Sequence, residues 1–234
     1  IAGGKKIEYH NAKNYLLSAT LKDAASVSLP IGELELMPNR IIEFSQVGIY
    51  AAKLSSDAKL EVNGKKLTCK VTSNKFDIEF DKLGNLNSLT LAEDALWGIS
   101  TSEIKLPIES YLSFKRKYLS HVILVNPTEL NIKGQSYTVI PKTKRASLQF
   151  SDENILESFV IGDGYTLIVD GQKVNVQSET EVELTYAAGD YIISSFEISE
   201  PITVNVYKGS KVKKTDVKAG KRLVIEEGKV VKLK

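Results

Sequence analysis

The sequence predicts an all-β fold in which antiparallel hairpins build two β-sandwich domains of jelly-roll or Ig-like type. Short apolar strands meet at glycine turns, and apolar and polar residues alternate along them. No long window places apolar residues at the helical spacing i, i+3, i+4 and i+7. The chain has 234 residues, of which 42% are hydrophobic and 26% charged, so it can bury a core in one large β domain or two small ones.

Four segments share one hairpin pattern, in which a glycine turn joins two short apolar strands. The turn glycines are Gly64, Gly134, Gly171 and Gly209. Asn63-Gly64 and Asp170-Gly171 are the clearest cases, because Asn-Gly and Asp-Gly accept the positive φ angles of a tight primed turn. We therefore expect a β-hairpin at each of these glycines.

Two short helical turns and one long strand are expected between the hairpins. Residues 92–97 suggest a helical turn that ends at Gly98, and residues 151–157 begin with an N-cap serine and early acids. The apolar residues of one parity between Tyr111 and Val125 suggest one long strand. Further strands are expected at residues 40–44, 47–53, 76–80, 147–150, 182–186 and 223–225.

The strand pattern restarts near Leu106-Pro107, which is the expected domain boundary. We expect an N-terminal β domain over residues 1–107, with a polar N-terminal arm, and a C-terminal β-sandwich over residues 108–234. One continuous sandwich with an N-terminal extension is the alternative.

The last three turn glycines, Gly134, Gly171 and Gly209, are almost evenly spaced along the chain. This recurrence is consistent with duplication or with the ordinary rhythm of a sandwich, whose short strands return at regular intervals. Residue identity between the segments hardly extends beyond the turns, so we favour the rhythm of a sandwich.

Charge is segregated along the second half of the chain, although the formal net charge is only +2. Residues 115–145 carry +6, residues 146–204 carry −10 and residues 205–234 carry +7. Neighbouring strands could interleave these charges as cross-strand pairs, or oppositely charged faces could meet between copies of the chain. The candidate association patches are Glu179, Glu181, Glu183 and Asp190 on the acidic side and Lys213, Lys214 and Lys218 on the basic side.

No motif in the chain indicates a catalytic, cofactor-binding or metal site. The sequence lacks a P-loop, a G-x-G-x-x-G fingerprint, a G-x-S-x-G elbow and an H-E-x-x-H motif. It contains one cysteine and two histidines, His10 and His121, to which we assign no catalytic role. Cys69 shares a strand parity with Leu67 and Val71, so we expect all three inward and the thiol unreactive.

We therefore expect a non-enzymatic structural or assembly protein, such as a virion coat, decoration or turret subunit or a surface filament subunit. The expected partners are copies of itself or other structural proteins, without a cofactor, a membrane span or nucleic acid. A glycan- or protein-binding β-sandwich module is the alternative. A virion or a cell surface is favoured over the cytoplasm as its location. Abundant lysine with few Cys, Met and His residues favours a thermophilic source, although an AT-rich genome would also enrich lysine over arginine.

Overall fold

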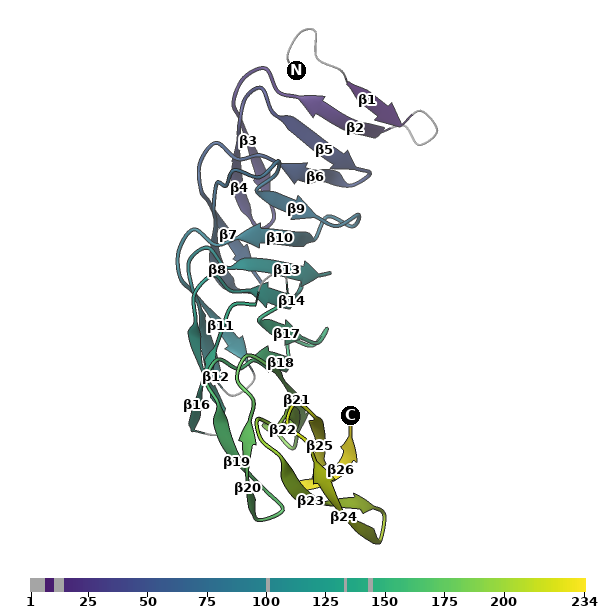
Figure 1. The fold of residues 1–234 in the computed structure, drawn as a ribbon. Helices are drawn as coiled ribbons and strands as arrows, with labels where there is room; N and C mark the ends of the chain where they lie inside the picture. The colour runs from purple at the N-terminus through teal and green to yellow at the C-terminus, as the bar shows by residue number, and fades with distance from the viewer. Residues whose placement is uncertain (1–6, 11–14, 100–101, 133, 143–144) are drawn as a thin grey trace. The chain divides into compact units, whose positions relative to one another are not determined.

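The computed structural model of the chain describes residues 7–10, 15–99, 102–132, 134–142 and 145–234 (Figure 1). All regular secondary structure in these ranges is β, and none of the described residues forms a helix. The described part therefore contains no helix that could cross a membrane. The chain divides into two compact units, residues 1–97 with 106–125 and residues 98–105 with 126–234.

The first unit contains a main antiparallel sheet and hairpins that leave it. In sheet order, the main strands are β1 (Glu8–His10), β2 (Tyr15–Thr20), β5 (Ile41–Ser45), β6 (Gly48–Ala52), β9 (Ile78–Phe80), β10 (Leu86–Thr90), β13 (Tyr111–Lys115) and β14 (Tyr118–Ile123). The hairpin strands are β3 (Ala25–Leu29), β4 (Gly32–Leu36), β7 (Ala58–Val62) and β8 (Lys65–Cys69). The chain passes between the units within β11 (Ala95–Ile99) and β12 (Ser102–Leu106).

The second unit repeats this plan. In sheet order, its main strands are β17 (Leu148–Phe150), β18 (Leu156–Val160), β21 (Glu181–Ala187), β22 (Asp190–Glu197), β25 (Arg222–Glu226), β26 (Lys229–Leu233), β23 (Ile202–Lys208) and β24 (Lys211–Val217). Its hairpins are β15 (Thr128–Ile132) with β16 (Gln135–Val139) and β19 (Tyr165–Val169) with β20 (Gln172–Val176). The last hairpin, β23–β24, instead joins the main sheet, where Val206 of β23 pairs in parallel with Val230 of β26.

Each repeating element is a long hairpin that bends at its middle. In the first one, β2 and β5 pair in the main sheet, and the chain between them forms the β3–β4 hairpin. The N–H of Asn39 donates to the Leu21 carbonyl oxygen at 2.9 Å, and this bond joins the two bends. Asn39 has a φ of +57°, and at this residue the chain turns from the β3–β4 hairpin back into the main sheet at β5. In Figure 1 the hairpin strands β3 and β4 run across the direction of β5 and β6.

The same bend recurs at Glu109 and Glu179, with the same bond. Glu109 donates its N–H to the Leu91 carbonyl at 2.9 Å, and Glu179 donates to the Ile161 carbonyl at 2.8 Å. Both glutamates have positive φ angles, +68° and +58°. The β-bulges recur at the same interval as the bends, at 43/44, 113/114 and 183/184. The bends and bulges therefore form a structural repeat in register, from which the Gly209 hairpin departs because its strands join the main sheet.

Single bridges tie the ends of four hairpins to residues that lie just beyond the first strand of the next repeat. The four bridges described are Leu36–Leu54, Cys69–Leu91, Val139–Ile161 and Val176–Ile198. At the first bridge, the N–H of Met37 donates to the Lys53 carbonyl at 3.0 Å and that of Ser55 to the Glu35 carbonyl at 2.8 Å. The other three bridges have the same pair of bonds, donated by Lys70 and Ala92, by Ile140 and Gly162, and by Gln177 and Ser199.

The core of each unit lies where a hairpin packs against the main sheet. The bridge residues are all nearly or completely buried, and alternate residues of the hairpins are buried as well. In the first unit, Trp97 of β11 contacts Phe114 of β13, with ring centroids 6.1 Å apart. In the second, Tyr137 of β16 contacts Phe159 of β18 at 5.5 Å.

The four hairpins predicted at glycine turns are confirmed. Asn63 and Gly64 have φ angles of +52° and +72°, and Asp170 and Gly171 have +51° and +74°, as a primed turn requires. Gly134 and Gly209 also have positive φ angles and join paired strands.

Both predicted helical turns are wrong. Residues 95–97 belong to strand β11, and residues 156–157 begin β18. Ser151 does accept backbone bonds as an N-cap would, from the N–H groups of Glu153 at 3.2 Å and Ile155 at 3.3 Å. However, these bonds close the turn between β17 and β18. The residues that follow Ile155 form strand β18 and not a helix.

The predicted long strand between Tyr111 and Val125 is also wrong, because it is the β13–β14 hairpin. Its turn is at Arg116 and Lys117, and Arg116 has a φ of +60°. The two-residue turn switches the inward parity, so Phe114 faces Leu119, but the β-bulge that follows restores it, so Leu112 and Val122 face each other and are both buried. Parity therefore could not separate this hairpin from one strand.

Substitution of Gly32 by Ala tests the pairing between hairpins. Gly32 pairs with Leu60 of β7 and has a φ of +147°, and an added Cβ would lie 2.5 Å from the Lys59 carbonyl oxygen. We expect Gly32→Ala to destabilise the protein by about 2 kcal/mol in urea unfolding. Gly164→Ala is the control, because its Cβ would lie 3.6 Å from its nearest atom, and it should change stability by at most about 0.5 kcal/mol. Equal effects would contradict this role of Gly32.

Candidate functional site

The predicted acidic patch lies on β21 and the segments beside it, and the carboxylates of Glu181 and Glu183 contact side chains of other strands. Glu181 accepts hydrogen bonds from Gln149 at 2.8 Å and Ser158 at 2.6 Å. Glu183 accepts a bond from Ser195 at 2.5 Å and lies 3.3 Å from the Arg222 guanidinium. Both side chains therefore stabilise the outer face of the main sheet through cross-strand contacts.

The other two acidic positions lie at bends and strand ends. Glu179 is exposed at the bend before β21, where its carbonyl accepts a hydrogen bond from the Lys142 ammonium at 3.2 Å. Asp190 begins β22 and accepts the N–H of Tyr191 at 2.8 Å.

The predicted basic patch lies on the edge of the second unit's main sheet. Lys213 and Lys214 are exposed on β24, and Lys218 is exposed in the following bend. The strand order ends at β24, so no described strand pairs with its outer side. None of the three lysines forms an ion pair with the acidic positions in the described part of the chain. Among the acidic positions, Glu183 forms an ion pair with Arg222.

Like charges face each other at the end of the β23–β24 hairpin, where Lys208 pairs with Lys211. An open cavity of about 820 Å³ lies beside these strands, lined by valines and lysines. Val212 is 54% exposed there. Because directly opposed like charges repel, this edge favours a neutralising anionic partner.

Sequence reasoning missed a buried ion pair at the bend of the second repeat. Lys53 lies 2.8 Å from Asp77, and their side chains are 7% and 0% exposed. Asp77 also accepts the N–H groups of Leu54 at 2.9 Å and Thr72 at 2.8 Å. The Lys53 ammonium in turn donates to the Thr72 carbonyl. The pair fixes the loop between β8 and β9, and its partners are far apart in the sequence, so no local motif could have revealed it.

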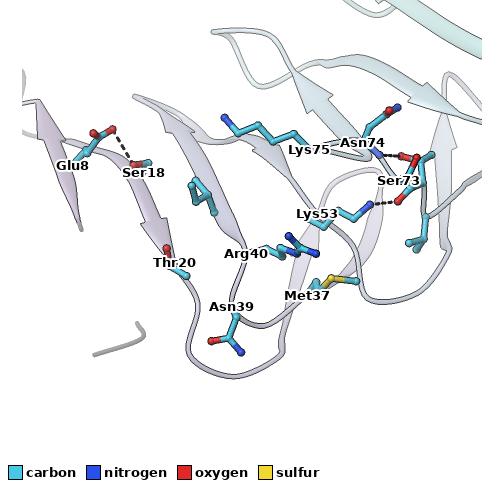
Figure 2. A pocket seen from close by; sticks show the side chains of 13 residues that line it. Glu8, Ser18, Thr20, Met37, Asn39, Arg40, Lys53, Ser73, Asn74 and Lys75 are labelled. Carbon is cyan, nitrogen blue, oxygen red and sulfur yellow. Dashed lines mark hydrogen bonds between the residues drawn. The ribbon is translucent and has the colours of Figure 1, made fainter. Parts of the chain in front are cut away.

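A cavity of about 970 Å³ in the first unit lies beside this ion pair (Figure 2). Arg40 and Lys53 lie close together in the view, near Met37. Two of the cations that line the cavity are neutralised, Lys53 by Asp77 and Lys75 by Glu43 at 2.7 Å. Arg40 is exposed at the bend before β5.

Cys69 is buried, as predicted. Of the three residues expected to lie inward on one strand, Leu67 and Cys69 share β8, but Val71 does not. Leu67 and Cys69 are 2% and 0% exposed on β8, whereas Val71 lies beyond the strand and is half-buried. Burial raises the pKa of the Cys69 thiol to about 12, and the charges of Asp77 and Asp57 add to this effect. The Sγ atom lies 3.4 Å from the Asp77 carbonyl oxygen.

The histidines lie on main-sheet strands. His121 is half-buried on β14, and this burial lowers its pKa. His10 belongs to β1. Among the described residues, no group of three or more His, Cys, Asp or Glu side chains is arranged to hold a metal ion.

Comparison with known proteins finds no matching family model, and no curated protein or solved structure matches the chain significantly.

Substitution of Lys53 tests the buried pair. Lys53→Met leaves the Asp77 carboxylate buried without its cation, and we expect a loss of about 3 kcal/mol in urea unfolding. Lys75→Met is the matched control, because Lys75 pairs with Glu43 near the surface, and it should cost at most about 1 kcal/mol. A Lys53 variant as stable as the control would show that the pair does not hold the loop.

The Cys69 thiol should react slowly in the native protein. Because its pKa is raised to about 12 from 9.0, the thiolate fraction should keep rising above pH 9, where a free thiol is already ionised. At pH 8 we expect modification by a thiol reagent to be at least about a hundredfold slower than in urea. A native rate that matches the unfolded one, or that levels off near pH 9, would contradict this environment.

Proposed function

We propose that the protein is a non-enzymatic structural subunit that self-associates through its β units. Suitable roles are a virion coat, decoration or turret subunit, or a subunit of a surface filament. The observation that carries the proposal is the open, lysine-rich edge of β24, which also exposes the apolar side chain of Val212. The location that follows is a virion or a cell surface.

The charges of this edge favour one mode of association. A lysine-rich edge strand resists pairing with an identical edge, because the ammonium groups would face each other. An acidic surface of a neighbouring copy avoids this repulsion, and the exposed carboxylate of Glu179 is one candidate. Contact between two different surfaces is heterologous and produces rings or filaments.

The finer fold assignment belongs to the same proposal. We propose two β-sandwich domains, residues 1–107 and 108–234, in which hairpins pack on a main sheet. The Tyr137–Phe159 contact supports such layers within residues 108–234. Limited proteolysis of the intact chain should then yield two resistant fragments, and a single resistant core would contradict the division.

If the source is thermophilic, the thermal midpoint should exceed the range of about 45–65 °C that is usual for mesophilic domains.

Light scattering after size-exclusion chromatography tests the association. We expect a mass above the 25.8 kDa of one chain at low salt and a shift toward monomer at high salt, because exposed ion pairs are screened within about 8 Å. Reversing Lys213, Lys214 and Lys218 to Glu should give monomer at low salt.

The control reverses three exposed lysines on hairpins, Lys59, Lys66 and Lys173, to Glu. This variant has the same change in net charge and should keep the assembly. A monomer under all conditions, or an equal response of both variants, would remove the proposed edge contact.

A protein- or glycan-binding module is the second candidate. It is favoured by an apolar groove in the first unit whose rim includes the most exposed large hydrophobic side chain described, Leu83. A monomer at both salt concentrations would make this the leading function.

A further inference from the structure

Two apolar side chains project from turns of the main sheet in the first unit. Leu83 is 74% exposed in the turn between β9 and β10, and Val47 is 58% exposed in the turn between β5 and β6. The two turns are adjacent, because a Cβ placed on Gly84 would lie 3.2 Å from Val47 Cγ2. Together they form a continuous apolar rim.

The turn that carries Leu83 is held by its own hydrogen bonds. The Asp81 carboxylate accepts the N–H groups of Leu83 at 2.8 Å and Asn85 at 2.9 Å, and it accepts the Asn85 side-chain amide at 2.9 Å. Partial burial raises the pKa of Asp81, but bonds from Asn85, Leu83 and Gly84 outweigh it and lower the pKa. Leu83 is therefore exposed on an ordered turn, which reduces the entropy lost when a partner binds.

This rim borders a groove of about 410 Å³ between the hairpin tips and the turns of the main sheet. Phe80, Phe114 and Val62 form its apolar lining, and Arg116 and Lys117 lie in the β13–β14 turn beside it. No carboxylate is among the described residues that line it. The groove thus combines apolar surface with positive charge.

The equivalent turn between β17 and β18 shows that the fold does not require this apolar rim. Glu153 occupies the position of Leu83 and is exposed, and Ser151 takes the place of Asp81 in closing the turn. Asn154, at the position of Gly84, also has a positive φ, +63°. Since a charged residue is accepted in the same turn, the exposure of Leu83 has no structural explanation in the repeat, and exposed apolar patches mark interaction sites.

We propose that this groove binds an extended segment of a partner protein that carries apolar side chains and at least one carboxylate. The apolar side chains pack against Leu83 and Val47, and the carboxylate lies beside Arg116 and Lys117. This binding does not depend on self-association at β24.

A displayed library of random twelve-residue peptides tests the proposal on the intact chain. Selection uses the wild-type protein, with counter-selection against the double variant Val47→Lys and Leu83→Glu, which introduces the residue types found at the equivalent positions of the later repeat, Lys117 and Glu153. We expect enriched peptides with at least two apolar residues and one Asp or Glu. Fluorescence anisotropy of these peptides should show at least about tenfold weaker binding to the double variant.

Two further variants separate the contributions. Arg116→Asn removes the charge while keeping a residue that tolerates positive φ, and it should weaken binding about fivefold and reduce its salt dependence. Leu96→Glu alters another exposed leucine, 58% exposed on β11, which does not line the groove, and should leave binding unchanged.

Three outcomes would overturn the proposal: no enriched peptide, equal binding to the wild type and the double variant, or enriched peptides without acidic residues. A fall in the mass of a self-associated wild type on Leu83→Glu substitution would also overturn it and assign the groove to a second copy.

Discussion

The bridge between successive repeats is the constraint on which the rest of the fold depends. At each one, two backbone N–H groups donate across a single pair of buried residues, such as Leu36 with Leu54 and Val139 with Ile161. Buried backbone groups that lose their partners cost about 1–3 kcal/mol each, so these positions permit little displacement. After two of the bridges the chain turns back at a residue of positive φ, at Asn39 after Leu36 and at Glu179 after Val176, whereas the chain between β8 and β9 turns back without one. The repeats therefore share bends and bridges although few of their side chains are identical.

Because the bends and bridges hold the repeats in place, the turns and the sheet edges can differ between repeats. Leu83 and Glu153 occupy the same place in equivalent turns, and both turns close through a side-chain oxygen of the preceding position 81 or 151. The last hairpin differs more, since β23 and β24 extend the main sheet and leave a basic edge. The surfaces proposed for binding and association thus lie where the repeat imposes the fewest requirements.

Local turn chemistry allowed the hairpins to be predicted, and its limits explain the errors. Asn63-Gly64 determines a primed turn without help from distant residues. Ser151 satisfies nearby N–H groups in the same way at a helix start and in a strand-to-strand turn, so the sequence before β18 was ambiguous. The Lys53–Asp77 pair and the groove beside Leu83 depend on residues brought together by the bends. The charge blocks were visible in the sequence, but the contacts of Glu181 and Glu183 within the sheet were not.

Native-state hydrogen exchange of individual amides tests most directly whether the bridges hold the repeats together. We predict that the amide hydrogens that donate at the bridges exchange only when most or all of the protein unfolds. These donors are Met37, Ser55, Lys70, Ala92, Ile140, Gly162, Gln177 and Ser199. The turn amides of Gly64 and Gly171 should exchange much faster. Bridge amides that exchange as fast as those turns would contradict the claim, because the repeats would then separate without unfolding.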